Sequence, residues 1–267
     1  MRYLLAPVSR PIACIGIDLA GLPHRETGVA ILRDGRLDHL SSAGGDDEIL
    51  ASVVQAGADA TVAINAPLTL PRGRCCLDDD CPCRHDPGTR SRALERELLR
   101  MKVPALATAL IKVLARRGYH LAATLRATGC APLEVYPFAT LRLLDLPASG
   151  KRTQLGRRRI HNALQPLVPG LDHPAASEHQ LDAVVCALTA HLWHVGHTRT
   201  VGEADEGLMV IPAPGALGAL CPSPPAFAEA LPRPRRVAED RVPYDSGAGS
   251  GAGSGDSGEA VGGHIAT

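Results

Sequence analysis

CIGIDLAG, residues 14–21, decides the fold, because it is an apolar run that ends in a single carboxylate, Asp18. Such a run predicts a buried strand. A buried, unpaired carboxylate is costly, so an acid at this end has to be solvated, to cap a neighbouring group or to hold a cation. Asp18 is therefore the first candidate for a functional residue.

The segments on both sides of this stretch predict an α/β fold. We expect strands at 12–18, 28–33, 36–40, 61–65 and 133–137, with a hairpin turn at Asp34-Gly35. We expect helices from Asp46 or Asp47 to Gly57 and at 91–101, 103–118, 139–145, 153–167 and 177–196. This order predicts a mixed five-stranded sheet, three antiparallel strands and then parallel ones, flanked by helices. Residues 207–212 are a candidate for a short closing strand.

Composition divides the chain into a folded domain, residues 1–213, and a tail, residues 214–267. The chain has 267 residues, of which 45% are hydrophobic, and this is enough for one good core. The tail is rich in Pro, Gly and Ser and has no periodic apolar face, so we expect it to be disordered. Gly253, Gly255 and Gly258 match a nucleotide-binding pattern, but no strand precedes them and no helix follows, which excludes that interpretation.

Charge is balanced over the whole chain but not along it. Residues 72–161 hold 18 Lys and Arg against 8 Asp and Glu, although the chain as a whole has 28 of each. This excess indicates either a basic face for a polyanion or an Arg-rich solvated surface. The residues that we expect to contact nucleic-acid phosphates are Arg72, Arg74, Arg84, Lys151, Arg152, Arg157, Arg158 and Arg159.

The sequence predicts a cytoplasmic protein that does not enter a membrane. Pro7, Arg10 and Pro11 interrupt the N-terminal region before a signal-peptide core can form. No apolar stretch reaches the roughly 18 residues that a membrane-spanning helix needs. We therefore expect the cysteines to be thiols or metal ligands rather than disulfides.

Oxygen ligands follow several of the predicted strands. Asp18 and Asn65 end two of them, Glu134 lies in a third, and Asp182 lies in the first turns of the last long helix. Ligands collect where the central strands of an α/β sheet end, and carboxylates gathered there favour Mg²⁺ or Mn²⁺. Each residue also has a structural explanation: a solvated strand end for Asp18, an Arg126 or Arg142 partner for Glu134, and the helix dipole for Asp182.

Five segments together carry a resemblance: IGIDLAG…TGVAIL, VAINAPLTLP, LEVYPFATLRLL, HQLDAVVCALTAH and EGLMVIP. Over residues 12–213 they resemble the uncharacterised bacterial family of predicted nucleases with a ribonuclease H-like fold. The segment that starts at His179 also resembles the last-helix acid motif of Holliday-junction resolvases.

The resemblance implies catalytic, metal-binding acids at Asp18, Glu134 and Asp182, with His179 as a further ligand or proton carrier. Asn65 departs from the pattern, in which an acid precedes Ala-Pro. Its amide oxygen is a fourth possible ligand but brings no charge, so a second metal ion would bind more weakly there.

A cysteine-rich loop, residues 72–90, interrupts the domain. Four cysteines and a histidine lie within eleven residues, namely Cys75, Cys76, Cys81, Cys83 and His85. They are candidates for a structural zinc site, in which His85 is an alternative to one cysteine, although the spacing is not that of the usual C-x₂₋₄-C pairs. Free thiols are the other interpretation. Cys14, Cys130 and Cys186 lie in core-like segments, where packing explains them.

These observations favour a divalent-metal-dependent nuclease that hydrolyses phosphodiester bonds. The choice between DNA and RNA stays open, because aromatic residues, on which bases stack, make up only 3% of the chain. Asn65 favours an alternative, a catalytically weakened nucleic-acid or protein-binding module. A third class, the actin-like ATPases and sugar kinases, needs a second glycine-rich phosphate loop, which the folded part lacks.

Overall fold

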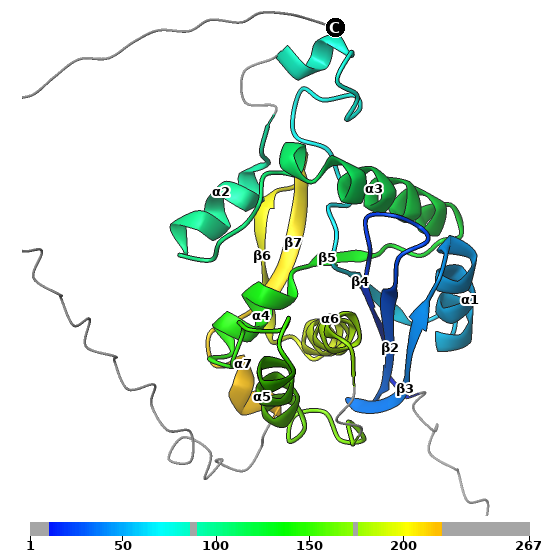
Figure 1. The fold of residues 1–267 in the computed structure, drawn as a ribbon, viewed down its shortest axis with the longest axis vertical. Coiled ribbons are helices and arrows are strands. Elements are labelled where there is room, and N and C mark those ends of the chain that lie inside the picture. Colours follow the sequence, from blue (N-terminus) through cyan, green and yellow to red (C-terminus); the bar gives the residue numbers. More distant parts are fainter. Residues whose placement is uncertain (1–10, 86–89, 173–175, 221–267) are drawn as a thin grey trace, which may run out of the picture. The chain divides into compact units, whose positions relative to one another are not determined.

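A seven-stranded mixed sheet forms the centre of the fold in the computed structural model, which describes residues 11–85, 90–172 and 176–220 (Figure 1). The strand order is β3-β2-β1-β4-β5-β7-β6. β2 pairs antiparallel with both β1 and β3, β4, β5 and β7 run parallel to β1, and β6 is antiparallel to β7. The strands are β1 (Ala13–Asp18), β2 (Thr27–Arg33), β3 (Arg36–Ala43), β4 (Thr61–Ile64), β5 (Leu133–Val135), β6 (Thr198–Glu203) and β7 (Gly207–Pro212).

The predicted five-strand sheet is wrong in its count, although a mixed α/β sheet flanked by helices is confirmed. β7 is the candidate closing strand, and β6 is a strand that the sequence did not predict. β6 reads TRTVGE and buries only Val201, because it lies at the edge of the sheet. A half-exposed edge strand needs no apolar run, so its sequence gives little signal.

The helices follow the predicted order with shifted ends. They are α1 (Asp46–Ala56), α2 (Ala93–Arg100), α3 (Lys112–Ala127), α4 (Pro137–Leu143), α5 (Gln154–Leu164), α6 (Glu178–His194) and α7 (Ala216–Leu220), with 3-10 turns at Pro82–His85 and Thr108–Leu110. The helix predicted at 103–118 begins only at Lys112. Pro104 favours an extended residue before it, and the chain from 103 to 107 is not helical.

The predicted tail boundary also moves. α7 lies beyond residue 213, and its Ala216 is buried in the main core, so the ordered part extends at least to Leu220. The rest of the predicted tail, residues 221–267, lies outside the described residues. Within the described ranges, no helix has the length and apolar character needed to cross a bilayer.

Alternate residues of the central strands face two separate apolar cores. Ile15 and Ile17 pack with α1 and α3 on one side of the sheet, whereas Cys14 packs with α4, α5 and α6 on the other. Figure 1 shows α1 and α6 on opposite sides of the β1–β3 part. Because successive strand residues point to opposite faces, the unbroken apolar run of β1 is explained by helices on both faces.

Two glycines bring α6 directly onto the sheet. A Cβ added at Gly16 would lie 2.1 Å from the carbonyl oxygen of Ala183, and one added at Gly28 would lie 2.0 Å from that of His179. Both distances are far below van der Waals contact, so only glycine permits this approach. Since Gly28 pairs with Asp18 across the sheet, the first turn of α6 is held beside the end of β1.

Candidate active site

Five polar side chains meet where β1 and β4 end, and we call them the Asp18 cluster: Asp18, Asn65, Lys151, His179 and Asp182. Asp18 is the last residue of β1, and Asn65 follows β4 directly. His179 and Asp182 lie in the first turns of α6, and Lys151 lies in the turn before α5. Asp18, Asn65 and Asp182 were predicted to converge at the strand ends, His179 was added by the resemblance, and Lys151 was predicted as a phosphate contact; Glu134, predicted to converge with them, is not in the cluster.

Both oxygens of the Asp18 carboxylate accept hydrogen bonds. Asn65 donates from Nδ2 to Oδ1 at 2.5 Å, and His179 Nδ1 lies 2.7 Å from Oδ2. Asp18 is only 5% exposed, so these two polar partners compensate for its removal from water. The acid at the end of the buried strand is therefore neither solvated nor unpaired.

The contact with Asp18 fixes the state of the His179 ring. A carboxylate only accepts, so Nδ1 carries the proton and Nε2 is left for another partner. The hydrogen bond that His179 donates to Asp18 raises the pKa of His179, against the opposing effect of burial. A metal-binding histidine commonly donates its other ring N–H to a carboxylate in this way.

Asp182 is the most strongly perturbed acid of the cluster. Its pKa is raised to about 6: burial is the largest cause, the nearby Lys151 opposes it, and repulsion from Asp18 adds to the rise. The Lys151 ammonium lies 2.5 and 2.6 Å from the two Asp182 oxygens. Two carboxylates that repel each other in a buried site attract a cation, and in this structure the cation on Asp182 is Lys151.

Glu134 is engaged elsewhere, which changes the interpretation of this residue. Arg92 donates to its two oxygens at 2.6 and 2.7 Å, and the backbone N–H of Leu68 donates to it at 2.8 Å. Glu134 and Arg92 are 4% and 1% exposed. Its partner is thus Arg92 rather than Arg126 or Arg142, and these contacts give Glu134 a structural role: it binds the segments on both sides of the cysteine loop, Leu68 before it and Arg92 after it.

Arg92 is a residue of this region that sequence reasoning missed. Besides Glu134, it donates to Glu95 at 3.0 Å and to the hydroxyl of Thr69 at 2.8 Å. It precedes α2 directly, and Glu95 closes a capping box with it. An arginine at the N-cap is not the Ser or Thr of the usual capping-box signal, and nothing in the sequence points from Arg92 to an acid 42 residues away.

A cavity of about 200 Å³ lies between Asn65 of the Asp18 cluster and the Arg92–Glu134 ion pair. Asn65 lies in its wall together with Arg92, Glu134 and Tyr136, and the rest of the lining is largely apolar. Burial raises the pKa of Tyr136, and the charge of Asp182 raises it further. The Asp18 cluster thus has a hollow beside it with polar groups on one side.

The predicted phosphate-binding residues separate into two groups. A second, open cavity of about 630 Å³ has Arg152, Arg157 and His179 in its wall, beside Lys151. Arg158 and Arg159 are exposed on α5, the same helix as Arg157. This group lies beside the Asp18 cluster.

The other group lies in the cysteine loop. Arg72 pairs with Glu203 and Asp205, and Arg74 donates to the carbonyl of Cys76. Arg84 donates to the backbone carbonyl of Asp79. These three residues hold protein groups, and only the first group is positioned to extend the site.

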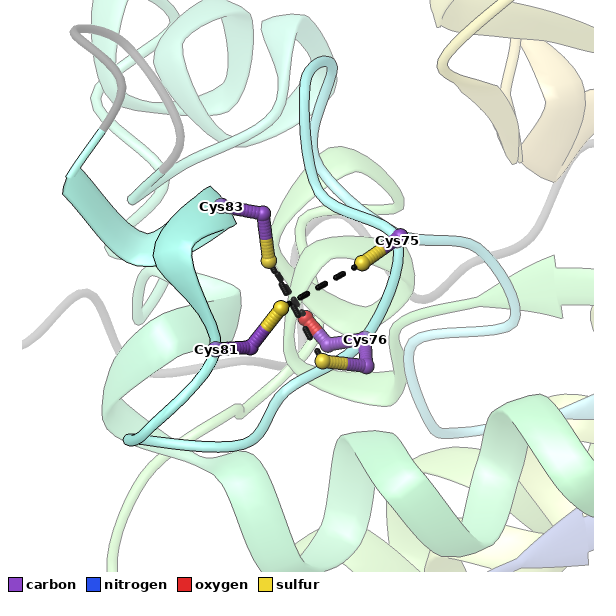
Figure 2. A group of neighbouring side chains, drawn as sticks. All are labelled: Cys75, Cys76, Cys81 and Cys83. Carbon is purple, nitrogen blue, oxygen red and sulfur yellow. Dashed lines mark hydrogen bonds between the residues drawn. The ribbon is translucent and has the colours of Figure 1, made fainter.

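The four cysteines of the loop form a second candidate site. Figure 2 shows the side chains of Cys75, Cys76, Cys81 and Cys83 pointing toward one another. Their sulfur atoms all lie within 4.8 Å of one another. His85, the alternative ligand, is not part of this group.

The donor set of the Asp18 cluster fits one hard cation better than two. Asp18 and Asp182 supply carboxylate oxygens, Asn65 an amide oxygen after an amide flip, and His179 its Nε2. Outside the cysteine loop, the described residues hold no group of three Asp, Glu, His or Cys ligand atoms all within 4.8 Å of one another. A cation at Asp182 would also have to displace the ammonium of Lys151.

Comparisons with known proteins give one match. The model of a family described as "Protein of unknown function (DUF429)" matches residues 16–207. This range runs from the middle of β1 to the start of β7 and contains the whole Asp18 cluster and the cysteine loop. The comparison with curated proteins found no match, and the comparison with solved structures found none.

Proposed function

Because this chain belongs to the family described as Protein of unknown function (DUF429), whose description names no activity, we propose its function from the site itself: a divalent-metal-dependent nuclease that hydrolyses phosphodiester bonds. One observation carries the proposal. Asp18, Asn65, His179 and Asp182 come from three separate segments and meet where β1 and β4 end. A ribonuclease H-like arrangement, with three antiparallel strands and then parallel ones, is consistent with β1–β5.

Asp18 and Asp182 are the residues that would hold Mg²⁺ or Mn²⁺, with the oxygen of Asn65 as a neutral ligand. When bound, the ion activates a water and stabilises the charge that develops on the phosphate. The pKa of Asp182, raised to about 6, lies below neutral pH, so its carboxylate is available to a cation under ordinary conditions.

His179 has the role of proton carrier or ligand. Asp18 holds Nδ1–H, which directs Nε2 away from the carboxylate. Since that contact raises the pKa of His179, the ring is protonated up to a higher pH than an isolated histidine, and it can give a proton to the leaving oxygen.

Lys151 and its neighbours are the proposed contacts to the nucleic-acid backbone. If an ion takes the place of the ammonium at Asp182, Lys151 is released at the edge of the site, beside Arg152 and Arg157. Arg158 and Arg159 are exposed on the same helix as Arg157 and add positive charge to α5. Contacts of this kind neutralise phosphates and make binding strongly dependent on salt.

A second candidate function is a binding module on the same fold with little or no catalysis. Three features favour it: the neutral Asn65, the Arg92 that occupies Glu134, and the Lys151 that occupies Asp182. Each removes negative charge that a second metal ion would need. Nucleic-acid binding would then rest on Arg152 and the arginines of α5.

The test is cleavage of labelled single- and double-stranded DNA and RNA in the presence of Mn²⁺, Mg²⁺ or EDTA. We expect metal-dependent cutting by the wild type and by Asp47→Asn, an exposed acid of α1. We expect a loss of at least 100-fold in Asp18→Asn, a typical size for the removal of one group that acts electrostatically in the reaction. Binding without cutting supports the module, and cutting that survives in Asp18→Asn contradicts the nuclease.

A further inference from the structure

The cysteine loop is a long connection with little to hold it. Its described residues, 72–85 and 90, contain one 3-10 turn, Pro82–His85, and one buried side chain, Leu77. Long connections without secondary structure of their own are uncommon in compact domains and are usually functional or mobile. Something other than apolar packing must hold this one.

The thiols of this loop differ from the other described cysteines. Cys14 and Cys186 are buried in the core, where a thiol packs as a small apolar group. Cys75 is exposed and Cys76, Cys81 and Cys83 are half-buried, yet all four point to a common centre (Figure 2). Burial does not explain why four partly exposed thiols gather at one point.

The distances between the sulfur atoms are those of a tetrahedral metal site. With zinc–sulfur bonds of about 2.3 Å, two ligand sulfurs of a tetrahedral zinc lie about 3.8 Å apart. Cys75 and Cys81 have their sulfurs 3.5 Å apart, and Cys76 and Cys83 have theirs 4.0 Å apart. The two values lie on either side of the ideal one, and all four sulfurs are free thiols.

Ion pairs hold the acidic part of the loop against α3. Asp78 pairs with Arg116 at 2.6 Å and Asp79 pairs with Lys112, so the three-acid segment between the cysteine pairs is tied to α3. Arg74 donates to the carbonyl of Cys76 at 2.9 Å, which places a positive charge next to the sulfur centre. Four thiolates and one zinc ion carry a net charge of −2, which nearby cations stabilise.

We propose that Cys75, Cys76, Cys81 and Cys83 bind one structural zinc ion that closes the loop onto α3. The four thiols lose their protons to solvent when the ion binds. Because all four positions are taken by sulfur, no position is open to water or substrate, and the site is structural rather than catalytic. His85 is not a ligand. This inference does not depend on the proposed nuclease activity.

The first test is the metal content and ligand type of the full-length protein. After purification without chelators, we expect one zinc per chain by elemental analysis. Replacement of zinc by Co²⁺ should give thiolate-to-cobalt charge-transfer absorption and the strong visible bands of tetrahedral sulfur coordination. Zinc well below one per chain together with no such absorption would overturn the proposal, as would disulfides between these cysteines in protein that is freshly purified under reducing conditions.

Variants test the assignment residue by residue. Cys81→Ser and Cys83→Ser should lose most of the bound zinc, whereas Cys130→Ser, a half-buried thiol outside the loop, should keep it. If the loop variants do not fold, the wild type still decides the question. Removal of zinc by a chelator should speed tryptic cleavage after Arg74 and Arg90 at least tenfold, and added zinc should restore protection. Unchanged cleavage on zinc removal contradicts a structural role.

Discussion

Replacement of Arg92 tests whether Glu134 is a structural acid. In Arg92→Met, a side chain of similar length leaves Glu134 and Glu95 without their shared cation, at 4% and 3% exposure. Removal of one partner from a buried ion pair costs about 3–5 kcal/mol, because an uncompensated charge stays buried. The N–H of Leu68 and the groups of Thr108 still bond to the two acids, so we expect a loss of about 3–5 kcal/mol at pH 7.5 rather than more.

The loss should depend on pH with a definite sign. In folded Arg92→Met, a buried carboxyl that has lost its cation binds a proton more readily. The same carboxyl in the unfolded chain binds its proton only near about pH 4.3. A group that binds protons more tightly when folded stabilises the protein at low pH and loses this contribution as the pH rises. The deficit should therefore shrink by up to about 1.4 kcal/mol for each pH unit from 7.5 toward 5.

The assay is urea unfolding followed by far-ultraviolet circular dichroism at several pH values. Arg100→Met, an exposed arginine of the same helix, is the matched control and should change stability by less than about 0.5 kcal/mol. Arg92→Met combined with Glu134→Leu should recover part of the loss, because it removes one of the two orphaned charges. A loss below about 1 kcal/mol, or one that does not change with pH, would refute the structural assignment of Glu134.

Three other predictions concern the Asp18 cluster. Gly28→Ala should lower the free energy of unfolding by about 1–3 kcal/mol, because the added methyl group would lie 2.0 Å from the carbonyl oxygen of His179. Gly218→Ala is the control and should lose no stability, because nothing lies within 4 Å of the added methyl group. Equal unfolding midpoints for the two variants would contradict the close approach of α6. In EDTA, Asp182→Asn should gain stability over the wild type as the pH rises from about 4 to about 7, by at most about 3 kcal/mol. The reason is that the wild type has to ionise a buried acid with a pKa of about 6. Thermal unfolding at these pH values measures the gain, and no gain would contradict the prediction. The contact with Asp18 raises the pKa of His179, so His179→Gln should lose more stability at pH 6 than at pH 9, and proton NMR titration of the wild type should give a value above 6.5.

The convergence of the cluster was readable from the sequence because it follows from topology. In a parallel α/β arrangement of this order, three segments meet at one edge of the sheet. They are the apolar run that ends in Asp18, the short strand that ends before Asn65, and the late helix with Asp182 in its first turns. The need for glycine in the first two strands was not predictable from the sequence. Gly28 is needed because the backbone of α6 passes directly over it.

The partners of the charges were not readable. Glu134 was expected as a metal ligand, but Arg92 lies 42 residues before it and no local pattern connects them. Lys151 was expected on a phosphate, whereas it binds Asp182. Such long-range pairs depend on which buried charges end up side by side, and this is decided by packing rather than by periodicity. The edge strand β6 was not predicted because only one of its residues, Val201, is buried, so its sequence has no apolar run.

The proposed activity depends most on a divalent ion held between Asp18 and Asp182, and calorimetric titration with Mn²⁺ at pH 7.5 tests this directly. The protein should first be freed of loosely bound metal, and zinc content should be followed in parallel so that the cysteine loop is not confused with this site. We expect one Mn²⁺ per chain for the wild type and for the control Asp47→Asn, with binding lost in both Asp18→Asn and Asp182→Asn. Equal Mn²⁺ affinity in all four proteins, or no binding by the wild type, would contradict the account.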